Sequence, residues 1–395
     1  RCHGIPPPKV IVIRRGREFV RKESGAVDLE ARQSEFAKKL ERLRAWLAEE
    51  RLEGVLLSRR DNFAWATAGG DNHVSSVTEV GVADLWVDQE RAVVLASNIE
   101  AARIDEEEMG GLDVELFAWP WYKDAEAEIQ RFVAGRHAAS DTGKAGLRDR
   151  RNAIAALRYQ LVPEEIARYE ELGRLTADAV ESVAATVRRR ETEFQVAARL
   201  MAALQERGLE PVVTLIAADG RIDRYRHPIP TDLAIERVAM LVSCARKGGL
   251  IASVTRLVHF GRLASDLMER HAAVTQLDAA IMARTRPGRT GAELFDEITR
   301  LYAEVGFPGE WERHHQGGAT GYAGREWRAT PSETRAVMED QAFAWNPSIT
   351  GTKSEDTIVV TAESFRILTR SRGRWPMRPV EIAGAVIERP DILVL

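Results

Sequence analysis

Apolar side chains in the first part of the chain alternate between helical and strand-like spacing. Between residues 34 and 50 they recur every three or four positions, which predicts an amphipathic helix. Gly54 then opens an apolar run at 55–57, and further runs at 85–87 and 92–96 predict strands, followed by a helix over 97–108. This alternation predicts a small α/β domain over residues 29–156, after an N-terminal tail over residues 1–28.

The rest of the chain has longer helical patterns separated by apolar runs. Pro163 suits the first position of a helix, and Thr290 and Glu293 have the spacing of a capping box. The expected helices cover 163–183, 193–207 and 290–303, and the expected strands cover 212–217, 238–244, 250–255, 341–345 and 357–361. Helix pairs around a mainly antiparallel sheet would form a second domain, 157–395, so we expect an α/β (α+β) protein of two domains.

Composition excludes several classes of protein. The net charge of −4, from 56 basic and 60 acidic side chains, gives no electrostatic reason to expect nucleic acid as a partner. We expect no membrane segment, because no run approaches the roughly 18 apolar residues of a membrane span, and residues 1–8 lack the apolar core of a secretion signal. With only Cys2 and Cys244, no disulfide framework is expected and a cytoplasmic location fits.

Four short segments carry a family resemblance through their order along the chain. They are VPEEI at 162–166, GLIASVTR at 249–256, RPGRT at 286–290 and NPSITGTKSEDTIVVT at 346–361. Together they resemble signatures of the creatinase/prolidase superfamily, which includes aminopeptidase P and methionine aminopeptidase. The resemblance implies a creatinase-type N-terminal domain followed by a catalytic domain of the pita-bread fold.

The resemblance also indicates where metal ligands would lie. Metal-using members hold two divalent ions with two Asp, one His and two Glu. In this chain the corresponding positions are Val242, Ser253, Gly318, Asn346 and Glu355. One carboxylate cannot neutralise two dications or fill their coordination shells, so we expect no dinuclear metal site and no cofactor. A displaced metal site would have to recruit His314, His315 or Asp356.

Creatinase, a member that works without metal, gives the resemblance a catalytic interpretation. His227, in the sequence Arg-His-Pro at 226–228, matches the loop that carries the creatinase histidine. We therefore predict His227 as the acid–base group, because the imidazole pKa lies nearest neutrality, and Glu355 as the group that orients water or a substrate cation. The alternatives are a hydrogen-bonded loop histidine, and a Glu355 paired with Arg256 or Lys353.

Candidate substrate contacts lie in both domains. The expected set in the C-terminal domain is His314, His315, Gln316, Arg325 and Asn346, in which the planar guanidinium suits a carboxylate. In the N-terminal domain, His73 and Trp65 lie where dimeric relatives reach into a partner's site, although core packing is the alternative for Trp65. The alternatives without a substrate contact are a turn in which His314 and His315 are merely exposed, and a surface ion pair at Arg325.

The sequence therefore predicts a creatinase-like, metal-independent hydrolase of a C–N bond in a small polar molecule or short peptide, acting as a homodimer. Two alternatives stay open. One is a metallopeptidase similar to prolidase or Xaa-Pro aminopeptidase with an atypical metal site. The other is a catalytically inactive pita-bread binding protein.

Overall fold

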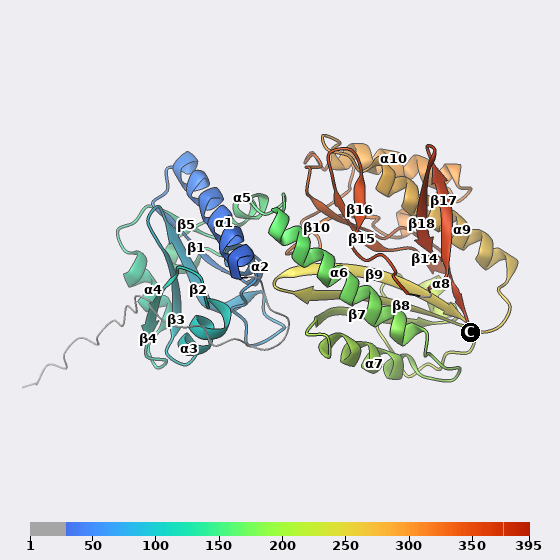
Figure 1. The fold of residues 1–395 in the computed structure, drawn as a ribbon, viewed down its shortest axis with the longest axis horizontal. Coiled ribbons are helices and arrows are strands. Elements are labelled where there is room, and N and C mark those ends of the chain that lie inside the picture. The colour runs from blue at the N-terminus through green and yellow to red at the C-terminus, as the bar shows by residue number, and fades with distance from the viewer. Residues whose placement is uncertain (1–28, 374) are drawn as a thin grey trace, which may run out of the picture. The chain divides into compact units, whose positions relative to one another are not determined.

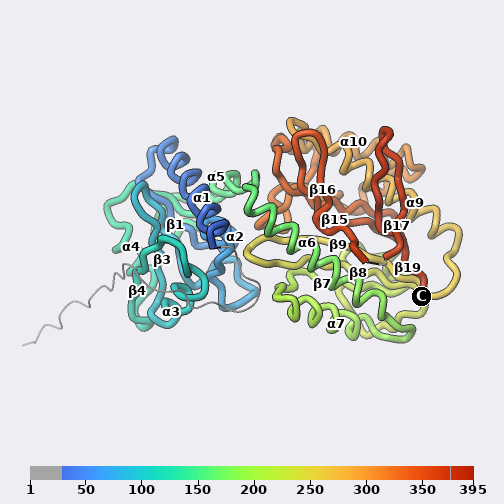
Figure 2. Tube along the Cα trace, in the orientation of Figure 1, coloured from blue at the N-terminus to red at the C-terminus, as the bar shows by residue number. Residues whose placement is uncertain are grey.

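The computed structural model describes residues 29–373 and 375–395. The predicted tail, 1–28, lies outside the described residues. The described residues separate into two compact units, one that ends at Arg158 and one that covers Tyr159–Leu395. Their colour runs from blue to red along the chain (Figure 1, Figure 2). Within the described residues, none of the helices combines the length and the apolar character needed to cross a membrane.

The first unit is built on a six-stranded mixed sheet with the order β4-β3-β2-β1-β5-β6. Its strands are β1 (Gly54–Arg59), β2 (Val80–Asp88), β3 (Ala92–Ser97), β4 (Glu115–Trp119), β5 (Ala138–Ser140) and β6 (Arg148–Asp149). Its helices are α1 (Leu29–Glu50), α2 (Arg60–Ala66), α3 (Ala101–Arg103), α4 (Ala125–Val133) and α5 (Arg151–Ala156). Leu56, Trp86 and Ile129 belong to its buried core.

One predicted helix of this unit, 97–108, differs in the structure. Strand β3 continues to Ser97, and helix α3 is only one turn long before it passes into the π-helical turn η1 (Ile104–Glu108). Four consecutive acidic side chains occupy this turn, and Asp105 and Glu108, three positions apart, would be neighbouring like charges on a regular helix. The Arg32 guanidinium donates to the carbonyls of Glu108 and Gly110 and so fixes the end of the segment.

The second unit contains two larger sheets and two hairpins. The first sheet has the order β19-β9-β8-β7, and the second has the order β11-β10-β12-β15-β16. The strands of the first are β7 (Glu210–Ala218), β8 (Val238–Lys247), β9 (Leu250–His259) and β19 (Leu393–Val394). Those of the second are β10 (Gly317–Thr320), β11 (Trp327–Arg328), β12 (Ala342–Trp345), β15 (Asp356–Val360) and β16 (Phe365–Ile367). All pairings in these sheets are antiparallel except that of β19 with β9.

Helices pack on these sheets in pairs. The helices α6 (Pro163–Ala184) and α7 (Glu193–Gln205) lie along strands β7–β9 (Figure 1), while α9 (Ser265–Arg284) contacts α10 (Gly291–Glu304) and the two hairpins. The hairpins are β13 (Ser348–Ile349) with β14 (Thr352–Lys353), and β17 (Met377–Ile382) with β18 (Ala385–Pro390). The Thr290 cap and the Pro163 start are both present. The predicted α/β (α+β) fold class is confirmed.

A buried ionic network fixes the start of β15. Asp356 accepts from the guanidinium of Arg389 at 2.6 Å and from that of Arg256 at 3.3 Å. Arg256 also donates to Glu181 at 2.8 Å, and Arg389 donates to Asp278 at 2.7 Å. Because each charge has an opposite partner, the network can remain buried. The network lies next to Glu355, the residue immediately before β15.

Candidate functional site

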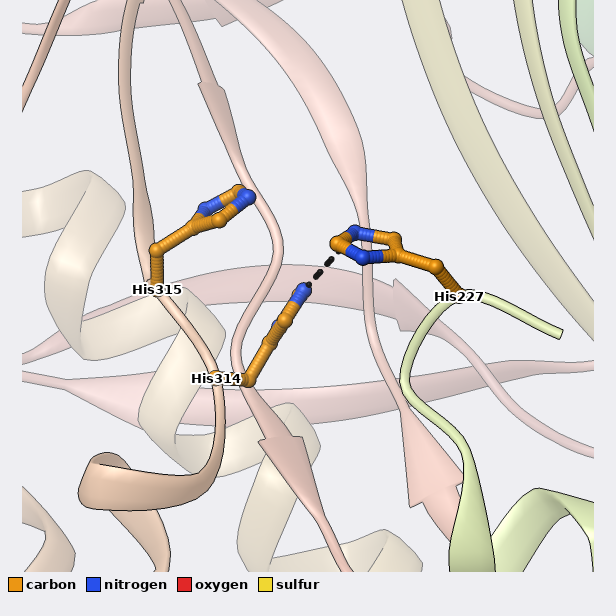
Figure 3. Close-up of side chains that lie close together, drawn as sticks. All are labelled: His227, His314 and His315. Atoms are coloured by element: carbon orange, nitrogen blue, oxygen red, sulfur yellow. Dashed lines mark hydrogen bonds between the residues drawn. The ribbon is translucent and has the colours of Figure 1, made fainter.

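Three histidines converge in the second unit. His227 follows the short helix α8 (Gly220–Arg224), whereas His314 and His315 join the 3₁₀ turn η3 (Glu310–Arg313) to β10. The Nε2 atoms of His227 and His314 are 3.3 Å apart, and the rings of His314 and His315 stack with centroids 4.5 Å apart (Figure 3). The loop at His227 and the loop before β10, far apart in sequence, thus form one cluster.

The environment of the three rings favours their neutral form. Burial, followed by the charge of Lys353, lowers the pKa of His314 to about 2. Burial, followed by Arg325, lowers the pKa of His315 to about 3. The pKa of His227 is also lowered, by burial and then by Lys353, although the charge of Glu355 opposes this. At neutral pH the cluster therefore presents three uncharged imidazoles.

Glu355 lies in an ion cluster that strand β9 positions. The backbone of Thr255 in β9 bridges to Glu355, and its hydroxyl donates to the carboxylate at 2.6 Å. The Lys353 ammonium lies 2.7 Å from the same carboxylate, and the Arg325 guanidinium lies 3.7 Å from it. Burial alone would raise the pKa of Glu355, but Lys353 and Arg325 outweigh it, so the pKa is lowered. Glu355 is therefore an anion between two cations.

The residues at the family's metal positions do not fit a pair of divalent ions. Val242 is apolar and buried in β8, and the Ser253 hydroxyl donates to Cys244 Sγ at 3.1 Å. A Cβ at Gly318 would meet the carbonyl oxygen of Trp327 at 2.2 Å, so no histidine side chain can be accommodated there without moving β11. The remaining carboxylate, on Glu355, is already neutralised by cations of the protein.

Asp356 does not supply a replacement ligand. Both of its oxygens are held by the guanidinium groups of Arg256 and Arg389, and one also accepts from the Thr369 hydroxyl at 2.7 Å. The sequence predicts that a displaced metal site would recruit His314, His315 or Asp356. In the structure, His314 and His315 lie together, and the third member of their cluster is His227 and not Asp356. Of the two partners considered for Glu355, Lys353 and not Arg256 lies beside its carboxylate. The role of Glu355 in orienting water or a substrate cation stays a prediction.

The other predicted substrate contacts of this unit differ in whether their polar atoms have hydrogen-bond partners. The Gln316 amide, 2% exposed, donates to the carbonyl oxygens of Trp311 and His314 and accepts from the Tyr302 hydroxyl at 2.5 Å. Gln316 therefore anchors the histidine loop, and its contact with a substrate stays a prediction. By contrast, Arg325 Nε and Asn346 Oδ1 are buried and have no hydrogen-bond partner among the described residues.

The two predicted contacts of the first unit lie in different environments. His73 is partly exposed, with Nδ1 2.7 Å from the Asp71 carboxylate. Trp65 has no exposed surface, and the Lys39 ammonium lies 5.2 Å from the centre of its ring. Complete burial favours the core-packing interpretation of Trp65, because a side chain without exposed surface cannot reach a substrate in a partner subunit. The role of His73 in a partner's site stays a prediction.

The sequence indicates Lys353 only as a possible partner of Glu355, and not as a residue that acts on the histidines. It lies two positions before Glu355, and side chains two apart in an extended segment point to the same side. Its sequence signal was therefore the spacing Lys-Ser-Glu at 353–355, in a segment that the family resemblance already marked. The positive charge of Lys353 acts on all three histidines as well as on Glu355.

Comparisons with known proteins agree with this architecture. Residues 167–362 match the model of metallopeptidase family M24. An uncharacterized peptidase, YqhT, from Bacillus subtilis is 25% identical over 228 residues, which cover 55% of this chain and 64% of that protein. The alignment thus spans slightly less than two thirds of the relative's length.

Solved structures show the same fold at low sequence identity. The prolidase from Pyrococcus horikoshii superposes with a TM-score of 0.72 at 20% identity, covering 85% of this chain and 99% of that one. The N-terminal domain of a FACT complex subunit from Cicer arietinum superposes with a TM-score of 0.66 at 13% identity, covering 87% and 97%. The two-part architecture of a prolidase-type protein is therefore present in this chain.

Proposed function

We propose that this chain, which carries a peptidase M24 domain and belongs to the creatinase/prolidase superfamily, hydrolyses a C–N bond without a dinuclear metal centre. The observation that carries the proposal is the pairing of Glu355 with Lys353 at 2.7 Å. An ammonium group at this carboxylate replaces the charge that a metal ion would supply, and it repels a further cation. This pairing argues against the alternative of a prolidase-like dinuclear metallopeptidase.

The charge balance of the site favours a substrate with an anionic group. Lys353 and Arg325 carry two positive charges against the single negative charge of Glu355, and the three imidazoles are neutral. Among the residues that the structure describes, Arg325 Nε has no hydrogen-bond partner, and Arg325 Nη2 lies 3.7 Å from Glu355, beyond normal hydrogen-bond distance. These donors suit a carboxylate, which a short peptide or a small amide-containing acid provides.

His227 is the proposed acid–base group. As a neutral imidazole it can accept a proton from water while the water oxygen forms a bond to the carbon of the C–N group. The resulting imidazolium is stabilised by the charge of Glu355, which acts to raise the pKa of His227. It then gives the same proton to the nitrogen as the C–N bond breaks. His227 is exposed, so a substrate can reach its ring.

The direct test is the substitution His227→Ala. The matched control is His137→Ala, which removes an exposed histidine from the first unit. Loss of acid–base catalysis is expected to reduce the rate about a hundred- to ten-thousandfold, with the melting temperature nearly unchanged. Release of ammonia or amine from a library of small amides, ureas, amidines and dipeptides provides the measurement. Equal turnover by wild type and His227→Ala excludes this role.

A binding protein without catalysis is the second candidate. The structural likeness to a domain named as part of a FACT complex subunit supports it, because the same architecture occurs there within a multi-protein assembly. In that case no library member would be hydrolysed, but anionic ligands would raise the melting temperature of the wild type. The substitution His227→Ala would reduce that shift.

Assembly as a homodimer and a cytoplasmic location are further parts of the proposal.

A further inference from the structure

The histidine cluster has the geometry of a metal site distinct from the family's carboxylate site. One ring nitrogen from each of His227, His314 and His315 lies within 4.8 Å of the corresponding nitrogen of the other two. Figure 3 shows the three rings directed toward one shared space. The closest pair, Nε2 of His227 and Nε2 of His314, is 3.3 Å apart.

The separation of the closest pair of nitrogens matches tetrahedral coordination. With zinc–nitrogen bonds of about 2.0–2.1 Å, two ligand nitrogens of a tetrahedral ion lie about 3.3 Å apart. The pair His227 and His314 already has this separation. The nitrogen of His315 needs to approach the other two by about 1.5 Å at most. The His227 side chain is exposed and that of His315 partly exposed, so their rings have room to turn about the side-chain bonds.

We propose that His227, His314 and His315 form a mononuclear site for a divalent transition metal of the zinc class. Three imidazoles without a free carboxylate select zinc, copper or nickel over magnesium and manganese, which prefer oxygen ligands. Three protein ligands leave a fourth position open for water. The site is separate from the dinuclear positions, since none of its three ligands corresponds to one of them.

Neighbouring charges set the strength of the site. The positive charges of Lys353, Arg325 and Arg328 disfavour a cation at the histidine cluster, and the negative charge of Glu355 favours one. The surplus of positive charge opposes a dication, so we expect affinity in the micromolar range and not the tighter binding of structural zinc sites. For the same reason, Lys353→Gln is expected to tighten zinc binding.

Metal binding at this cluster would regulate the proposed reaction. A neutral imidazole has one ring nitrogen with a free lone pair, so a metal ion bound there takes the lone pair with which His227 would accept the proton from water. Zinc is therefore expected to inhibit hydrolysis reversibly, and a chelator is expected to restore it. This regulatory step rests on the proposed function, whereas the metal site itself does not.

Isothermal titration of the full, chelator-treated chain with zinc chloride tests the site. We expect one ion per chain and little heat with manganese. His227→Ala or His315→Ala removes one of three direct ligands, so each should reduce affinity by about a hundredfold or more, since loss of an outer-shell partner alone costs about ten- to a hundredfold. His137→Ala serves as the control and should bind like the wild type. His227 lies on an exposed loop, so its removal should not impair folding, which circular dichroism can verify.

Cobalt absorption gives a second readout, because a tetrahedral site produces intense visible bands. Absence of saturable zinc binding, or equal binding by wild type and both histidine variants, overturns the metal site. Zinc binding to a chain that hydrolyses nothing leaves the site standing and contradicts the proposed function. Zinc binding without inhibition of an active chain contradicts the regulatory step alone.

Discussion

Replacing Lys353 with methionine probes the charge that takes the place of a metal ion. The ammonium and the Glu355 carboxylate are 2.7 Å apart, and their side chains are 5% and 2% exposed. Removing one partner of such a buried pair normally costs about 3–5 kcal/mol, because the other charge stays buried without compensation. Thr255 and the more distant Arg325 still act on Glu355. We therefore expect about 3 kcal/mol, the lower end of that range.

A double-mutant cycle separates this pair from general disturbance. The substitution Lys353→Met/Glu355→Gln removes both charges, so it should be less destabilising than the two single substitutions added together, by about 2 kcal/mol or more. The control is Arg366→Met, which breaks an exposed pair with Glu170 and should cost less than about 1 kcal/mol.

Urea unfolding of all variants, followed by tryptophan fluorescence and circular dichroism, gives the free energies. The two units need not unfold together, so the comparison uses the transition of the second unit, identified by hydrogen exchange in β9 and β15. If Lys353→Met changes stability no more than Arg366→Met does, or if the two single effects simply add, Lys353 does not compensate Glu355 and the electrostatic reasoning fails.

Three further predictions concern activity and assembly. Because burial and Lys353 lower the pKa of His227, kcat/KM should be constant near neutral pH and fall only below the ordinary histidine value of about 6.5. Removal of Lys353 should raise that pKa and so move the fall in kcat/KM to higher pH. A pH profile that does not move would contradict the assignment of His227. Arg325→Gln should raise KM for acidic substrates while neutral analogues stay unaffected, as steady-state kinetics can show; equal effects on both would remove the carboxylate contact. Light scattering should show a homodimer at micromolar concentration, and a monomer there would exclude a role for His73 in a partner's site.

The fold could be predicted from sequence because its signals are local and agree with one another. The cap at Thr290, the first-turn Pro163 and the ordered family motifs each marked an element that the structure contains. The segment 97–108 could not be predicted in the same way. The end of its π-helical turn is bound by Arg32 of α1, which lies 76 positions away in the sequence and donates to the carbonyl of Glu108.

The site was only partly predictable, for a related physical reason. Motif positions showed which ligands are missing, but they could not show that Lys353 neutralises Glu355 or that a Cβ at Gly318 would collide with β11. The convergence of His227 with His314 depends on two loops that approach from different elements. The role of Gln316 as an anchor for that loop likewise depends on Tyr302, which lies on α10.

The most direct test of the account measures hydrolysis and metal content on the same chelator-treated sample. The account predicts that the wild-type chain, with Mn, Co, Zn and Fe each well below one equivalent by elemental analysis, still releases ammonia or amine from its substrate. His227→Ala and Glu355→Gln should both abolish this release. Activity that appears only after two equivalents of manganese or cobalt are bound per chain would contradict it.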